Sequence, residues 1–289
     1  MNKKLPVIGL VMKSMEAEFF KEMKKGAIDY AKQRGDLELI TVGTRSQTEV
    51  SRQIQLVEEL IAQQVDAIVV IPIDSKALVA TAIKAVRAGI EVINTDIMLD
   101  PEMLSEHHIE LAFVGPDNEK AAKMVGDVLG KELGPGGKVV LIEGMPTAMN
   151  AQQRKKGFLD SITEHDLELL AAAVGNWETG QAAKAFSALL EHFPQIDGVM
   201  CANDAMALGV HSVLRKAGKS GEVKLVGFDN DPSAAALIRQ GKMVATVDCF
   251  GSRMAAKGID YAMRALSGDK QTGWIKTEMK LITSGKKER

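Results

Sequence analysis

The chain has 289 residues, 46% of them hydrophobic, and a formal net charge of −2 at pH 7. This length and apolar content are typical of about two globular domains, and the balanced charge argues against a nucleic-acid partner, which would favour a basic face. No apolar run approaches the roughly 20 residues that a membrane span requires.

Strands and helices are predicted to alternate from the start of the chain. The near-continuous apolar run at 5–12 is typical of a parallel strand covered on both faces. Apolar residues at helical spacing then predict a helix over 19–34. Further strands are predicted at 37–42, 67–71, 90–94 and 112–115, and further helices at 48–63, 75–88 and 118–132. Between them, 101–110 breaks the pattern and is expected to be a solvent-exposed loop.

The second part of the chain follows the same scheme. Strands are predicted at 138–142, 167–174, 198–201, 223–228 and 244–248, and helices at 152–163, 179–192, 205–217 and 233–240. An amphipathic helix over 252–266 and a last strand over 274–281 complete the set. Alternation of this kind implies parallel strands joined by right-handed crossovers, and therefore an α/β fold.

Paired segments indicate that the chain contains two copies of one α/β lobe. VDAIVVIPIDSKAL at 65–78 and IDGVMCANDAMALG at 196–209 share an apolar strand, a polar turn and a helix start. Asp66 and Asp197 lie 131 residues apart, and Asp96 and Asp229 lie 133 apart. We therefore predict two similar doubly wound parallel-sheet lobes joined by a three-strand hinge. The predicted domains are an N-terminal lobe, 1–114 plus 250–276, and a C-terminal lobe, 115–249 plus 277–289.

Catalytic and metal-binding motifs are not found. Cys201 and Cys249 lie in apolar strand contexts and are expected as two buried thiols. His107 and His108 have no further ligand at metal-binding spacing. The turn GPGG at 134–137 lacks the spacing of a phosphate-binding loop, and no G-x-S-x-G elbow occurs. We expect a protein that is not an enzyme and has neither a cofactor nor a bound metal.

Four segments carry a resemblance to a known family. They are the Phe19-Phe20 pair, NDAMALG at 203–209, VGFD at 226–229 and AAKG at 255–258. In this order and spacing, they make the chain resemble the ribose-type periplasmic sugar-binding proteins of ABC importers, which have the type I periplasmic binding protein fold. The resemblance covers essentially the full length.

The resemblance implies a function and a cellular setting. A monomeric solute-binding protein of this type captures a neutral sugar or sugar alcohol between its lobes and delivers it to a membrane permease. It works in the periplasm, after a signal peptide that this sequence does not contain has been removed. The effector domains of lac-type repressors share the fold, so a ligand-sensing domain of a regulator or of a chemoreceptor system is the alternative. That alternative implies a stable dimer and no permease.

The resemblance also implies a set of ligand-binding residues. In the family, an aromatic pair after the first strand and an aromatic residue of the other lobe enclose the sugar ring. The C–H faces of a sugar pack favourably on aromatic rings. Phe19, Phe20 and Trp177 match these positions. Carboxylates accept hydrogen bonds from hydroxyls, and an asparagine amide both donates and accepts. The matching hydroxyl-binding residues at three strand ends are Asp96, Asn203 and Asp229.

The chain also departs from the family pattern. Two positions at which many relatives have a ligand-binding arginine are Ile97 and Gln152, and a hinge glutamine is replaced by Cys249. We include Gln152 and Cys249 in the expected site, together with Lys13, which matches a hydroxyl-binding position, and Glu16 in the first loop. Two arginine guanidinium groups, each with five N–H donors, are therefore missing, and we expect a neutral ligand other than ribose. Another pentose, a hexose or a sugar alcohol would fit, and an anionic sugar phosphate would not.

Overall fold

The computed structural model describes residues 4–284, and the chain divides into two compact units. Of the described residues, 4–116, 147–149 and 250–277 form the first unit, called lobe 1. The others, 117–146, 150–249 and 278–284, form lobe 2. Two hydrogen bonds connect 147–149 to Ser75 of lobe 1: Ser75 N donates to Thr147 O at 3.2 Å, and Met149 N donates to Ser75 Oγ at 2.8 Å. Residues 1–3 and 285–289, at the ends of the predicted domains, lie outside the described residues.

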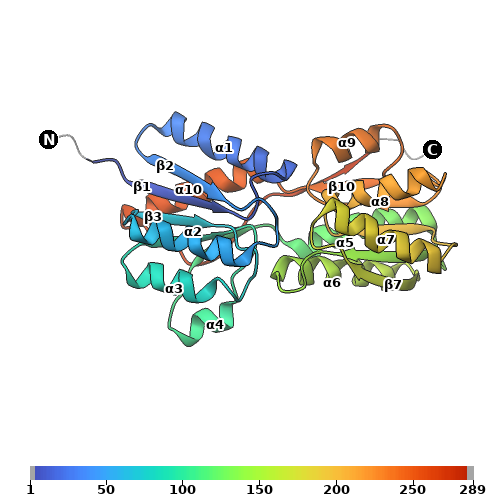
Figure 1. The fold of residues 1–289 in the computed structure, drawn as a ribbon, viewed down its shortest axis with the longest axis horizontal. Coiled ribbons are helices and arrows are strands. Elements are labelled where there is room, and N and C mark those ends of the chain that lie inside the picture. The colour runs from blue at the N-terminus through green and yellow to red at the C-terminus, as the bar shows by residue number, and fades with distance from the viewer. Residues whose placement is uncertain (1–3, 285–289) are drawn as a thin grey trace. The chain divides into compact units, whose positions relative to one another are not determined.

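Lobe 1 contains a six-stranded parallel sheet in the order β11-β5-β4-β3-β1-β2. Its strands are β1 (Val7–Met12), β2 (Glu38–Gly43), β3 (Ala67–Val70), β4 (Glu91–Thr95), β5 (Ala112–Gly115) and β11 (Gly273–Lys276). Its helices are α1 (Glu18–Arg34), α2 (Val50–Ala62), α3 (Val79–Arg87), α4 (Pro101–Glu106) and α10 (Gly251–Leu266). Figure 1 shows α1 and α10 on one side of the sheet and α2 and α3 on the other.

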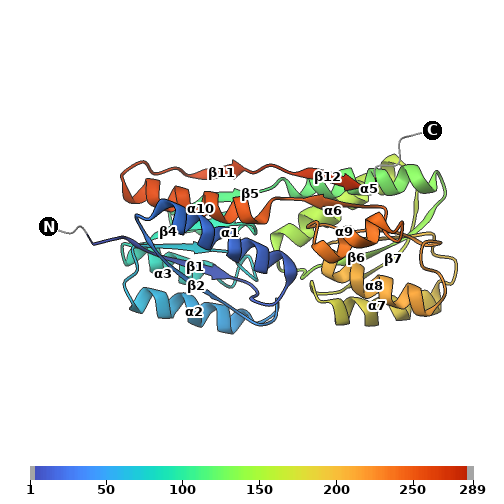
Figure 2. The same ribbon diagram turned by 90° about the horizontal axis from the view of Figure 1, so that it is seen from above.

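Lobe 2 repeats this topology, with the strand order β12-β10-β9-β8-β6-β7. Its strands are β6 (Lys138–Glu143), β7 (Glu168–Val174), β8 (Gly198–Cys201), β9 (Lys224–Val226), β10 (Ala245–Asp248) and β12 (Lys280–Thr283). All are parallel except β12, which is antiparallel to β10. The helices are α5 (Asn118–Leu133), α6 (Met149–Glu164), α7 (Thr179–His192), α8 (Asp204–Lys216) and α9 (Pro232–Arg239). Figure 2 shows α5 and α6 on the opposite side of this sheet from α7 and α8.

The repeat seen in the sequence has a direct counterpart in backbone contacts. Asp66 accepts a hydrogen bond from Val7 N at 2.7 Å, and Asp197 accepts one from Lys138 N at 2.8 Å. In each lobe the carboxylate thus accepts a hydrogen bond from the first residue of the first strand. These paired aspartates lie where their strands begin, far along each strand from the carboxyl edge.

Two predicted elements differ from the structure. The predicted loop at 101–110 begins with the helix α4, since Pro101 occupies its first turn and the Asp100 side chain accepts from Glu102 N and Met103 N. An Asp cap followed by proline is a helix start signal that the surrounding polar residues obscured. The single last strand predicted at 274–281 is two short strands, β11 and β12, which belong to different sheets. Across residues 4–284, no helix is long and apolar enough to span a membrane.

Candidate functional site

The residues predicted for lobe 1 follow the carboxyl ends of β1 and β4. Lys13 is buried, and its Nζ lies 5.5 Å from the centroid of the Phe20 ring. Phe20 is buried as well, whereas Phe19 is partly exposed and meets it edge to face at 5.1 Å. Asp96 directly follows β4 and is buried, with a left-handed φ of 64°. The structure therefore groups Lys13 with the aromatic pair and places Asp96 at the same edge of the sheet.

Glu16, in contrast, is exposed and does not join this group. Its side chain is exposed, and its carboxylate is 3.4 Å from Lys21 Nζ. Ser14 organises the loop in which it lies, because the Ser14 hydroxyl accepts from the backbone N–H groups of Glu16 and Ala17 at 3.1 Å. This arrangement leads the chain into α1, whose N-cap, Ala17, has no side-chain acceptor of its own.

The residues predicted for lobe 2 follow β7, β8 and β9. Trp177 is 1% exposed, and its indole lies so close to Gly144 that a Cβ there would be 2.2 Å from the ring. The Asn203 side chain accepts from Met206 N at 2.9 Å, which caps α8, and its amide lies 3.5 Å from Trp177 O. Asp229 has a φ of 116°, in the region where non-glycine residues are strained.

Arg154 connects the lobe 2 residues to one another. Its Nη1 donates to Ala202 O at 2.7 Å and to Asp229 Oδ1 at 3.4 Å, and its Nε donates to Asn118 Oδ1 at 2.9 Å. The guanidinium carbon lies 3.5 Å from the Phe228 ring centroid and 5.5 Å from that of Trp177. With a side chain only 4% exposed, Arg154 acts as a buried support whose Nε and Nη1 groups donate to residues of its own lobe.

Asp204, the residue after Asn203, is a second buried ionisable group of this edge. It is fully buried, and its carboxyl accepts from Thr246 Oγ1 at 2.9 and 3.0 Å and from Asp231 N at 2.9 Å. Burial raises its pKa well above the usual range, and the nearby carboxylates of Asp229 and Asp231 raise it further. Burial likewise raises the pKa of the Cys201 thiol.

Gln152 and Cys249 complete the predicted set. Gln152 is exposed in α6, and its Nε2 donates to Pro146 O at 2.9 Å. Cys249 directly follows β10 and is 2% exposed. Cys201 and Cys249 both lie buried as thiols, as predicted.

One cluster of carboxylates and histidine has the spacing of metal ligands within the described residues: Asp127, Glu164 and His165. The Lys123 ammonium already lies within it, at 2.8 Å from Asp127 Oδ2 and 2.6 Å from Glu164 Oε2. The lysine thus supplies the cation that these carboxylates bind.

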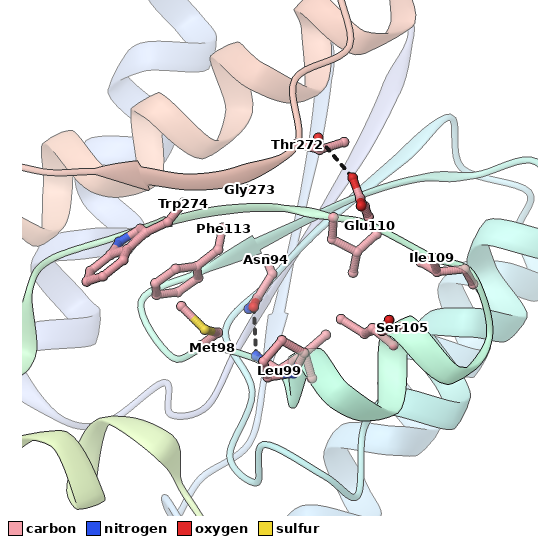
Figure 3. A pocket seen from close by; sticks show the side chains of 13 residues that line it. Asn94, Met98, Leu99, Ser105, Ile109, Glu110, Phe113, Thr272, Gly273 and Trp274 are labelled. Carbon is pink, nitrogen blue, oxygen red and sulfur yellow. Dashed lines mark hydrogen bonds between the residues drawn. The ribbon is translucent and has the colours of Figure 1, made fainter.

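Lobe 1 also contains an apolar pocket of about 400 Å³, which the sequence did not reveal (Figure 3). Phe113 and Trp274 lie on one side of it, with ring centroids 6.2 Å apart, and α4 lies on the other. Its most deeply buried polar residue, Asn94, uses its side chain for Ile97 O and Leu99 N, at 2.7 and 2.8 Å. None of the predicted ligand-binding residues lines this pocket.

Sequence reasoning missed the supporting residues of lobe 2. Asp204 and Thr246 are polar side chains inside apolar surroundings, and Asn118 looks like an ordinary helix-start residue. The one available signal was Asp204, an acidic residue directly after Asn203, together with Gly227, which leaves room for its carboxyl. The sequence alone does not show that these two residues are in contact.

Two homologous parallel-sheet lobes, each with polar side chains at its carboxyl edge, define a ligand-binding protein of the periplasmic binding type. Comparison with known proteins agrees: the family described as periplasmic binding protein domain matches residues 8–270, and the chain belongs to it. Its members are substrate-binding proteins of ABC importers and not enzymes.

Individual relatives extend over nearly the full length. The D-ribose/D-allose-binding protein of Pseudomonas aeruginosa is 41% identical over 284 residues, which cover 96% of this chain and 89% of that protein. A crystal structure of an ABC transporter solute-binding protein from Burkholderia multivorans is 40% identical, with a TM-score of 0.95, and the match covers 97% of this chain and 100% of that one. A solute-binding protein from Actinobacillus succinogenes with bound D-allose is 33% identical, with a TM-score of 0.91, over 96% of this chain and 98% of that one.

Proposed function

We propose that this protein binds a neutral sugar or sugar alcohol and delivers it to the permease of an ABC importer. The observation that carries this proposal is the grouping of Trp177, Asn203 and Asp229 around the buried Arg154 at one sheet edge. An indole packs against the C–H face of a sugar, while a carboxylate and an amide bind its hydroxyls. These are the two recognition elements that a polyhydroxylated ligand requires.

The charges at the two edges favour a neutral ligand. Asp96 and Asp229 are acceptors for hydroxyl protons and would repel a phosphate or carboxylate. Arg154 is paired with Asp229 at 3.4 Å, and its Nε and Nη1 donate to Asn118, Ala202 and Asp229 within lobe 2. These two charges therefore balance each other, and Asp96 is the carboxylate that disfavours an anion. Lys13 is the one cation among the predicted site residues.

The choice among neutral sugars rests on the relatives. Similarity to a D-ribose/D-allose-binding protein supports an aldose of related stereochemistry. The chain has Ile97 and Gln152 where many relatives have arginine, so two guanidinium groups that bind hydroxyls through several donors are missing. We therefore expect a neutral ligand other than D-ribose, such as another pentose, a hexose or a sugar alcohol.

We further propose that residues of both lobes hold the same ligand. Lys13, Phe19 and Asp96 would act from lobe 1, and Trp177 and Asp229 from lobe 2. Contacts divided in this way are completed only when the lobes close, so the ligand favours the closed form by its differential affinity. The protein would act as a monomer in the periplasm, which size-exclusion chromatography and cell fractionation would test.

Intrinsic fluorescence tests the proposed ligand class. The chain has two tryptophans, and Trp274 is 39% exposed whereas Trp177 is 1% exposed. A Trp274→Phe variant therefore leaves Trp177 as the sole reporter. Titration with D-allose, D-ribose, xylitol and ribose 5-phosphate should give a saturable change with at least one neutral compound and none with the phosphate. Binding of the phosphate alone, or of none of the four, would contradict the proposal.

A further inference from the structure

A buried carboxyl links the segments that carry Asn203 and Asp229. Asp204 directly follows Asn203, and its backbone N–H donates to Phe228 O at 2.7 Å, next to Asp229. The two proposed ligand contacts are therefore connected through one residue that is itself fully buried. Asp204 thus lies in the interior of lobe 2, behind the two proposed contact residues.

The side chain of Asp204 also holds the residues that follow Asp229. Its Oδ2 accepts from Asp231 N at 2.9 Å, and it accepts from Thr246 Oγ1, which in turn accepts from Asn230 N at 3.2 Å. Asp229 and Asn230 have φ values of 116° and 57°. Because such conformations cost free energy in non-glycine residues, they persist only where the surroundings hold them.

The sequence leaves space for this carboxyl at one position. A Cβ at Gly227 would lie 2.1 Å from Asp204 Oδ1, so any side chain there would collide with the carboxyl oxygen. The glycine of VGFD and the aspartate of NDAMALG thus depend on each other.

Lobe 1 shows that the fold does not need a carboxyl at this position. By the repeat, Ile73 occupies the position of Asp204, and it is also fully buried. Asp96 still adopts its left-handed conformation, and the loop after it is held by the Asn94 side chain. Burying a carboxyl costs free energy that an apolar residue avoids. At this position lobe 2 therefore bears a free-energy cost that lobe 1 does not.

We propose that Asp204 is a positioning residue: it holds Asp229 in the geometry that binds the ligand and makes no contact with the ligand itself. This inference rests on the proposed function. It states that any effect of Asp204 on affinity passes through the Asp229 carboxylate. An aspartate that only stabilised the start of α8 would affect affinity independently of Asp229.

A double-mutant cycle separates these roles. Isothermal titration calorimetry with D-allose, or with the tightest neutral compound of the panel, would compare the intact chain, Asp204→Asn, Asp229→Asn and the double variant. We expect Asp204→Asn to weaken binding about tenfold in the intact chain and less than about twofold in the Asp229→Asn background, because coupled residues are non-additive. Thr246→Val should show the same pattern, and it serves as the second variant if Asp204→Asn does not fold.

The control is Phe186→Leu, which changes a fully buried side chain of α7 that takes no part in these hydrogen bonds. It should lower the midpoint of thermal unfolding and leave the dissociation constant within about twofold. Wild-type affinity in both Asp204→Asn and Thr246→Val, or equal losses in the two backgrounds, would overturn the inference while the proposed function stands. An intact chain that binds no neutral sugar or polyol would instead overturn the proposed function, and this inference with it.

Discussion

The burial of Asp204 has a consequence for the pH dependence of stability. Its pKa in the folded protein is raised by burial and by Asp229 and Asp231, so the folded chain retains a proton that the unfolded chain releases. The stability contributed by this proton is complete at pH values below the ordinary aspartate pKa of 3.8 and is lost as the pH rises toward the folded-state pKa. The buried Cys201 thiol, also near this carboxyl, has a raised pKa as well and stays neutral in this range.

Asp204→Asn removes this proton uptake. We expect the free energy of unfolding of the variant, relative to the wild type, to rise between pH 4.5 and pH 7, whatever its sign at either pH. Urea denaturation at both pH values measures the difference. A relative stability that is constant or falls with pH would show that Asp204 is ionised in the folded state.

Asp66 and Asp197 provide a matched pair whose role is confined to the backbone. Each accepts one hydrogen bond from the first strand of its lobe, and both side chains are exposed. Replacing either with alanine should lower the free energy of unfolding by about 1 kcal/mol and leave ligand affinity unchanged, because neither lies at a carboxyl edge. Chemical denaturation and calorimetry check the two expectations, and a marked loss of affinity would contradict the structural role.

Close helix packing depends on Gly26 and Gly157, which lie 131 residues apart, the same offset as Asp66 and Asp197. A Cβ at Gly157 in α6 would lie 2.1 Å from Glu119 O, and one at Gly26 in α1 would lie 2.3 Å from Ser252 Cβ. Alanine at either site should destabilise the chain by about 1–3 kcal/mol, because the paired helices must move apart.

Gly180 in α7 is the control for this prediction, because no atom lies within 4 Å of the Cβ that alanine would add. Its substitution should be neutral or stabilising by up to about 1 kcal/mol, as expected from helix propensity. Equal losses of thermal stability at all three glycines would show that close packing is not the cause.

The alternation of strands and helices and the internal repeat were readable from the sequence because apolar periodicity and paired residues report them directly. The helix α4 was not, since it is short and polar, and neither was the division of the last segment into β11 and β12. The resemblance to the family predicted Trp177, Asn203 and Asp229 as ligand-binding residues, and the structure places them at one sheet edge. Their mutual support through Arg154 and Asp204 depends on tertiary contacts that leave no periodic signal.

Two homologous lobes explain why the proposed ligand contacts occur in corresponding places. Asp96 and Asp229 both follow the fourth strand of their lobe, both are left-handed, and both donate a backbone N–H to the next strand, at Val114 O and Val247 O. A duplicated fold thus offers two similar acidic edges, and a single ligand held by both would link its binding to the relative motion of the lobes.

Calorimetric titration of Asp96→Ala and Asp229→Ala with the best neutral ligand tests whether one ligand uses the acidic edges of both lobes. We expect one binding event per chain in the wild type and a loss of affinity of at least about tenfold in each variant, since each removes an acceptor for ligand hydroxyls. Wild-type affinity in either variant, or two independent binding events per chain, would contradict this expectation.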